Sequence, residues 1–266
     1  MKTASPSLPE GEQRARQGAA DKNRRVRQGA SVTDEAIEKI RELIISGHWK
    51  AGDRLPREND LAAQLGLSRN SLREAVRALA LVRVLEVRQG DGTYVGSLEP
   101  DQLLQSTRFV THLLRDHTIV ELFEVRRLLE PAAAALAAVR MDEPALHALR
   151  AELDRMMAAT TVEELVEADV AFHAVIAGAA GNAVLSSLLD SLSTRTLRAR
   201  LWRGLADEQA LDSTRAEHTR IYEAIMRKDP ELARAAATVH IATGELWLRQ
   251  RLASGEEPAL ETTALN

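Results

Sequence analysis

Hydrophobic residues recur with a helical period over much of this chain. Between residues 69 and 81, Leu72, Val76 and Leu79 follow one another at spacings of four and three. This spacing predicts an amphipathic helix with one apolar stripe, and it leaves Arg73 and Arg77 outside the stripe. One face of the helix is therefore expected to pack, while the other can face phosphates or base edges.

The surrounding sequence extends this pattern into a small domain. Ser31 or Thr33 can cap a helix that turns Ile37, Ile40 and Ile44 inward. Residues 55–95 then predict a second helix ended by a glycine turn, the helix described above, and a glycine-tipped hairpin. This is the outline of a winged helix-turn-helix, and DNA binding is the first hypothesis.

From Asp101 onward the pattern predicts only successive amphipathic helices separated by caps and breakers. Leu, Ala, Arg and Glu dominate this region, and β-branched alternation is almost absent. The breaks fall at His117-Thr118, Asp142-Glu143-Pro144, Thr160-Thr161, Gly181-Asn182, Gly204 and Asp229-Pro230. We therefore expect helices near residues 101–115, 118–140, 142–159, 161–179, 182–203, 208–228 and 230–252.

The predicted fold is mostly α, with an N-terminal winged helix-turn-helix and an antiparallel C-terminal bundle of about seven helices. We place the DNA-binding domain at residues 31–97 and the bundle at 101–252. Residues 1–30 have almost no large apolar side chains and predict a disordered basic arm, and residues 253–266 predict a flexible tail. The arm is either a solvated extension or a contact to DNA backbone.

Composition narrows the class of protein. The chain has no cysteine, which excludes disulfides and thiolate metal sites and fits a reducing compartment. It has no apolar run of the roughly 18 residues that a membrane span needs, and its first residues lack a signal-peptide core. We therefore expect a cytoplasmic protein without membrane contact.

The net charge of -4 is unevenly distributed. Residues 1–30 carry seven basic and three acidic side chains, and residues 31–97 carry ten of each, so the bundle holds the acidic excess. Residues 68–90 nevertheless contain five arginines against two glutamates. An acidic body with one basic patch favours DNA binding at that patch alone.

Two sets of motifs carry a family resemblance. The string LPRENDLAAQLGLSRNSLREAVRAL, followed by VRQGDGTYV, resembles the winged helix of the GntR family of bacterial transcription regulators. In the second half, EVRRLLE, DVAFH, AEHTRIYEAI and ATVH resemble the FCD effector domain of that family's FadR-like branch. The resemblance implies a homodimer that binds an inverted repeat in double-stranded operator DNA, most commonly as a repressor released by a small organic acid or sugar acid.

Carried over residue by residue, the resemblance assigns DNA-facing positions in both motif helices and in the wing. They are Arg57, Asn59, Ser68, Arg69, Asn70, Ser71, Arg73, Gln89 and Gly90. Arginine can donate two hydrogen bonds to guanine, and a helix N-terminus suits phosphate. The chain departs from many relatives at Arg83, where they have glycine, so either the turn is built differently or Arg83 adds a phosphate contact.

A second constellation points to metal binding. Asp169 and His173 lie four residues apart, so on a helix they share one face. His218 and His240 lie on two later predicted helices that can turn toward the same centre. By the resemblance, all four stand where metal-binding FCD domains carry ligands. This donor set suits a divalent Zn, Ni, Mn or Fe ion with positions left for a bound acid.

Two further positions are candidates for the effector cavity. The resemblance places Arg126 on the helix that faces the cavity, although an ion pair with Glu130 is an alternative. Asn182 resembles the family's helix-start asparagine and can be an N-cap or a pocket residue.

Two alternatives to a metal-dependent sensor are an enzyme and a regulator with a structural metal. A histidine-rich site with an open position also occurs in metallohydrolases, but the sequence shows no well-placed general base, phosphate loop or Ser-His-Asp spacing. Alternatively, the metal is purely structural. We expect a regulator rather than an enzyme.

Overall fold

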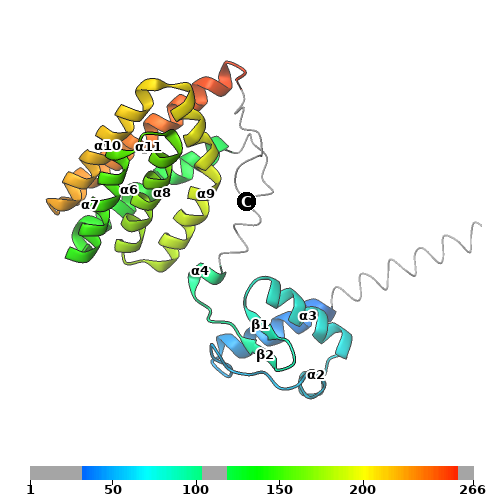
Figure 1. Ribbon diagram of the computed structural model, residues 1–266. Helices are drawn as coiled ribbons and strands as arrows, with labels where there is room; N and C mark the ends of the chain where they lie inside the picture. The colour runs from blue at the N-terminus through cyan, green and yellow to red at the C-terminus, as the bar shows by residue number, and fades with distance from the viewer. Residues whose placement is uncertain (1–31, 104–118, 257–266) are drawn as a thin grey trace, which may run out of the picture. The chain divides into compact units, whose positions relative to one another are not determined.

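The computed structural model describes residues 32–103 and 119–256, and the chain divides into two compact units, Met1–Leu103 and Leu104–Asn266. Each unit is described by itself below (Figure 1). The basic arm predicted at residues 1–30 and residues 257–266 of the tail predicted at 253–266 lie outside the described residues. Most of the helix expected at 101–115 also lies outside them, and only α4 (Pro100–Leu103) is described there.

The N-terminal unit is a winged helix-turn-helix. Residues 32–45 form its first helix, followed by α2 (Glu58–Leu65), α3 (Arg69–Leu81), β1 (Leu85–Arg88) and β2 (Gly92–Val95). The predicted stripe of α3 is confirmed, because Leu72, Val76 and Leu79 are all buried in a core shared with the first helix and the strands. Burial of this stripe fixes the opposite face of α3 toward solvent.

The turn between α2 and α3 has the caps that its sequence predicts. Gly66 follows α2 with a φ of 66°, a left-handed conformation that glycine adopts without steric cost. Ser68 caps α3, and its Oγ accepts a hydrogen bond from the Ser71 backbone N–H at 3.1 Å.

The wing is a twisted antiparallel hairpin in which Leu85 pairs with Val95 and Arg88 with Gly92. A further segment joins it: the Leu55 N–H donates to the Thr93 carbonyl at 2.8 Å, which ties the chain before α2 to the wing. Gly90, at the tip, has a φ of 78°. The tip is therefore held on a small sheet that is anchored in the core.

The structure answers one question that the sequence left open, namely how the turn after α3 accommodates Arg83. Arg83 has a φ of 61°, so the backbone keeps the left-handed conformation that glycine would favour. The backbone that follows β2 lies close to this turn, since a Cβ on Gly96 would be 2.4 Å from the Arg83 carbonyl oxygen. The turn is thus not rebuilt, and Arg83 carries its backbone strain.

The C-terminal unit is an all-helical bundle. Its described helices are α6 (Ile119–Arg140), α7 (Glu143–Ala158), α8 (Val162–Ala179), α9 (Ala183–Ala206), α10 (Glu208–Met226) and α11 (Pro230–Ala253). Four of them begin at side-chain caps at the predicted breaks, namely Asp142, Thr161, Asn182 and Asp229. No described helix is both long and apolar enough to cross a membrane.

One predicted break is wrong. Gly204 was expected to end a helix near residue 203, but α9 continues through it to Ala206. A Cβ at Gly204 would lie 2.5 Å from Val162 Cγ1, so close packing explains the glycine better than a helix end does.

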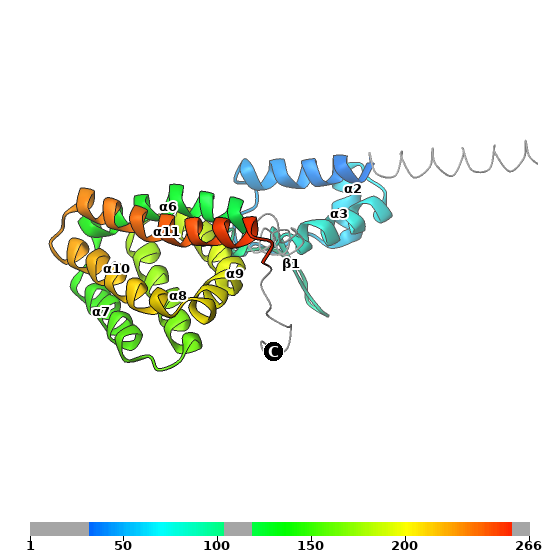
Figure 2. The same ribbon diagram turned by 90° about the horizontal axis from the view of Figure 1, so that it is seen from above.

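Helices α6 and α11 lie side by side along one face of the bundle, as Figure 2 shows. They are antiparallel: Arg127 at the start of α6 pairs with Glu245 near the end of α11 at 2.9 Å, and Glu124 pairs with Arg249 one turn further along. The largest apolar cluster of the described residues lies between the helices of the bundle. It includes Phe172 of α8 and Ile221 of α10, both fully buried. This core surrounds the candidate site.

Candidate metal centre and DNA-binding face

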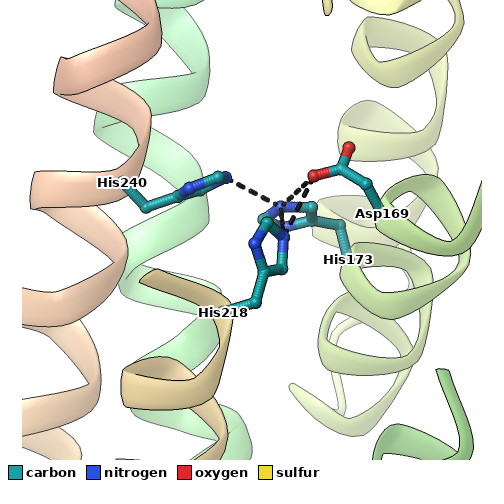
Figure 3. Close-up of side chains that lie close together, drawn as sticks. All are labelled: Asp169, His173, His218 and His240. Carbon is teal, nitrogen blue, oxygen red and sulfur yellow. Dashed lines mark hydrogen bonds and ion pairs between the residues drawn. The ribbon is translucent and has the colours of Figure 1, made fainter. Parts of the chain in front are cut away.

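Three helices bring the four predicted ligands to one point in the bundle. Asp169 and His173 lie one turn apart on α8, His218 comes from α10 and His240 from α11 (Figure 3). One ligand atom from each residue lies within 4.8 Å of the others. Asp169, His218 and His240 are buried, and His173 is largely buried.

The distances between these atoms have the size expected around a single ion. His173 Nε2 lies 3.2 Å from His240 Nε2 and 3.3 Å from His218 Nε2, and Asp169 Oδ1 lies 3.0 Å from His218 Nε2. Ligand atoms bound at about 2.1 Å to one ion are roughly 3.0 to 3.4 Å apart in octahedral or tetrahedral geometry. The four donors therefore fit a common divalent ion.

Each imidazole is oriented through its other nitrogen. His240 Nδ1 donates to Glu217 Oε2 at 2.9 Å, and His218 Nδ1 donates to the Thr214 carbonyl at 2.8 Å. His173 Nδ1 lies 3.0 Å from Glu130 Oε2. A proton on Nδ1 leaves the Nε2 lone pair free, so all three rings present their ligand atom inward.

The ionisation of the cluster favours metal binding at Asp169 and His240, whereas at His173 an ion has to compete with a proton. Burial disfavours the charged forms of Asp169 and Glu130, but Arg200 and Arg126 outweigh it and hold the pKa of each carboxyl below its usual range. Burial, together with the neighbouring His218 ring, lowers the pKa of His240 to about 4. For His173, burial is outweighed by Glu130 and Asp169, which raise its pKa to about 9. A bound cation would displace that proton, as metal binding to histidine requires.

A cavity of about 40 Å³ adjoins the cluster, and Asp169 and His240 belong to its lining. Arg126 also lines the cavity, where its guanidinium lies over the Phe123 ring at 5.1 Å. Arg126 also forms the ion pair with Glu130 that the sequence offered as the alternative. The sequence did not indicate Arg200 and Arg203 of α9, which add two further cations to the lining.

Asn182 lies elsewhere. It is exposed at the start of α9, where its Oδ1 accepts from the Leu185 N–H at 3.1 Å, and it is not among the residues that line the cavity. Its N-cap role accounts for the residue, so we remove it from the candidate ligand site.

The N-terminal unit exposes the positions that were assigned to DNA. Arg69 and Asn70, in the first turn of α3, are exposed beside the Ser68 cap. Arg73 is half exposed and pairs with Glu58 of α2 at 3.3 Å. The remaining positions, Arg57, Asn59, Gln89 and Gly90, are exposed, and Ser71 is half-buried.

Comparison with known proteins agrees with this architecture. Residues 32–95 match the description "Bacterial regulatory proteins, gntR family", and residues 121–243 match the FCD domain. The chain is 32% identical to the HTH-type transcriptional regulator LutR of Bacillus subtilis (strain 168), with 76% of this chain and 94% of LutR covered. The chain belongs to the GntR family. It is a transcription regulator of the type that joins a GntR helix-turn-helix to an FCD domain, a family of DNA-binding regulators rather than enzymes.

Other relatives agree. The chain is 30% identical to the galactonate operon transcriptional repressor of Escherichia coli (strain K12), covering 82% of this chain and 97% of that protein. It is also 30% identical to the Glc operon transcriptional activator of the same strain, covering 80% and 87%. Among solved structures, Streptococcus agalactiae GntR matches with a TM-score of 0.56 and 30% identity over 81% of this chain and 99% of that one.

Proposed function

We propose that this regulator is a homodimeric repressor. Its affinity for operator DNA is controlled by a small organic acid or sugar acid that binds at a divalent metal centre. Asp169, His173, His218 and His240 would hold the ion, and Zn, Ni, Mn and Fe all suit this donor set. Operator binding would place its action in the cytoplasm.

One observation supports the metal centre above all others. Three Nε2 atoms and one carboxylate oxygen converge at ligand spacing, while the Nδ1 atoms of His218 and His240 each have a hydrogen-bond acceptor and His173 Nδ1 lies 3.0 Å from Glu130 Oε2. A packed core histidine satisfies its nitrogens with unrelated partners, and three of them would not share one centre. The arrangement therefore supports a metal site over three separate structural histidines.

The adjoining cavity supports a sensing role over a purely structural one. Asp169 and His240 belong to the cluster and also line the cavity, so an ion bound by the cluster would present open coordination positions to the cavity. Such an ion binds and polarises a carboxylate oxygen, and Arg126 adds a fixed cation for the same group. One relative is named for galactonate, a sugar acid.

For the DNA-binding face, we propose that α3 enters the major groove of an inverted repeat and that the wing tip at Gln89 and Gly90 reaches the adjacent groove. Arg69 and Asn70 would read bases, because both are exposed. The Ser68 and Ser71 end of the helix would hold phosphate. Arg73 can join them, since an exposed ion pair such as Arg73–Glu58 is worth only about 0–1 kcal/mol.

The homodimer is supported by an exposed apolar surface on the paired helices α6 and α11. Leu128 and Val139 of α6 are 70% and 64% exposed, and Val239 and Leu246 of α11 are 54% and 57% exposed. Leu232 and Val239 are seven residues apart, as are Val239 and Leu246, so they form one stripe. Contiguous apolar surface of this kind marks an interface, and a second copy of the same surface would cover it.

The metal centre is tested by elemental analysis of purified full-length variants. His218→Ala should remove the ion, because it deletes one donor from the set. His147→Ala changes an exposed histidine on α7 and should keep the metal content of the parent protein. Full occupancy in His218→Ala would defeat the assignment, provided that the variant's circular dichroism shows a folded bundle.

Sensing is tested by titrating an operator fragment with metal-loaded and metal-stripped protein at fixed salt. Lactate, malate, glycolate and tartronate are the first acids to add, and any acid that raises the melting temperature is carried forward. The proposal expects at least one acid to weaken operator binding only when metal is present. An acid response that survives metal removal would contradict it.

A further inference from the structure

The cavity beside the metal centre holds one arginine that forms no ion pair within the described residues. Of its three arginines, Arg126 pairs with Glu130, and Arg200 pairs with Asp169. Arg203, one turn beyond Arg200 on α9, makes no ion pair with any described acidic side chain. Its Nε is buried and has no hydrogen-bond partner among the described residues.

A carboxylate close enough to interact with Arg203 is already engaged. Glu217 is close enough for Arg203 to lower its pKa, although burial acts in the opposite direction and His240 lowers it more. Its two oxygens accept from His240 Nδ1 at 2.9 Å and from Ser213 Oγ at 3.2 Å. A guanidinium carries five N–H donors, so most of the hydrogen-bonding capacity of Arg203 remains unused.

A glycine of α11, Gly244, lies next to this guanidinium in the wall of the cavity. Gly244 lies in the interior of α11, where glycine weakens a helix. A Cβ at this position would be 3.2 Å from the Phe123 ring and 3.7 Å from Arg203 Nη1. The glycine thus lets Phe123 pack closely against α11 beside Arg203, in the wall of the cavity.

The balance of charges around the centre indicates which kind of ligand could occupy the cavity. Around the centre, three arginines face three carboxylates, those of Asp169, Glu130 and Glu217. A divalent ion bound by neutral imidazoles adds two positive charges that these residues do not compensate. Two negative charges from the ligand would balance them.

We propose that Arg203 binds a second anionic group of the effector, so that the natural ligand class is a short dianionic acid such as a dicarboxylate. One carboxylate would meet the metal and the other would meet Arg203 through two parallel hydrogen bonds. The cavity volume of about 40 Å³ favours a short chain, because one water needs about 10–15 Å³ on this scale. This inference rests on the proposed metal-dependent sensing.

Matched pairs of acids test the inference. Glycolate and tartronate share a 2-hydroxycarboxylate end and differ in a second carboxylate, and so do lactate and malate. Isothermal titration of the zinc-loaded full chain should show tighter binding of the dianion in at least one pair. Arg203→Gln should reduce dianion affinity by about tenfold or more, the scale of a lost charge-assisted pair, and leave monoanion affinity within about twofold.

Two further variants control for structure. Arg198→Gln removes an exposed arginine of the same helix that does not line the cavity, and it should preserve the preference for dianions. Arg203→Lys keeps the charge without the planar fork and should retain part of that preference. The melting temperature of each variant without acid shows whether the bundle remains folded.

Each outcome decides between the two proposals. If neither dianion binds better than its monoanion, or if Arg203→Gln weakens both members of a pair equally, the role of Arg203 is wrong while metal-dependent sensing can still stand. If zinc does not bind, or if acid binding is the same after metal is removed, the proposed function itself fails.

Discussion

The hydrogen bond between Glu217 and His240 provides a test of the metal centre that leaves all four ligands in place. Glu217 Oε2 accepts from His240 Nδ1 at 2.9 Å, and both side chains are buried. Glu217→Gln keeps the shape but removes the negative charge. It also allows the amide N–H₂ to face Nδ1, which would favour the tautomer whose proton blocks Nε2.

The expected loss follows from the role of that bond. A carboxylate that orients a metal-bound histidine typically contributes a factor of about 10 to 100 in metal affinity, or roughly 1.4 to 2.7 kcal/mol. Only one of the three imidazoles is affected, because His173 and His218 are oriented by Glu130 and the Thr214 carbonyl. The variant should therefore still bind the ion, but more weakly.

Competition for zinc with a chromogenic chelator measures this loss directly. Glu223→Gln is the matched control, since Glu223 lies on the same helix and, within the described part of the chain, pairs only with exposed Arg227. If Glu217 merely stabilises the bundle, its replacement will lower the melting temperature of metal-free protein and leave zinc affinity within about twofold of the parent. That result would refute the reasoning.

Three other predictions concern the rest of the chain. Arg69→Ala should weaken operator binding by about 1–3 kcal/mol if Arg69 reads a base; equal affinity in a titration at fixed salt would remove it from the interface. Leu128→Glu, at a position 70% exposed on α6, should convert the dimer to monomers in sedimentation without loss of helix content, and an intact dimer would exclude this surface. Arg83→Gly should raise the free energy of unfolding of the N-terminal unit by about 1 kcal/mol, because glycine relieves the left-handed strain at φ 61°. Lower stability in a denaturant titration would show that the Arg83 side chain stabilises the turn.

Local signals in the sequence predicted much of the fold. The Leu72, Val76 and Leu79 stripe and the caps at Asp142, Thr161 and Asp229 depend on residues close together in the chain, and the structure has each of them where the pattern places it. The helix end predicted at Gly204 is wrong because a glycine that packs closely against Val162 looks the same in sequence as one that ends a helix.

The candidate site was only partly visible in the sequence. Asp169 and His173 share a face at i and i+4, a relation that spacing reveals, whereas the family resemblance supplied His218 and His240. Glu130, Glu217 and Arg203 come from three different helices, and their roles depend on how those helices pack. For Asn182 the sequence offered an N-cap or a pocket residue, and the structure shows the N-cap, with Asn182 absent from the cavity lining.

Anomalous diffraction from crystals of the zinc-loaded full chain tests the central claim most directly. The account predicts one strong peak about 2.0–2.2 Å from the Nε2 atoms of His173, His218 and His240 and from an oxygen of Asp169. A map without a peak at that point, or with zinc bound only elsewhere on the chain, would contradict it.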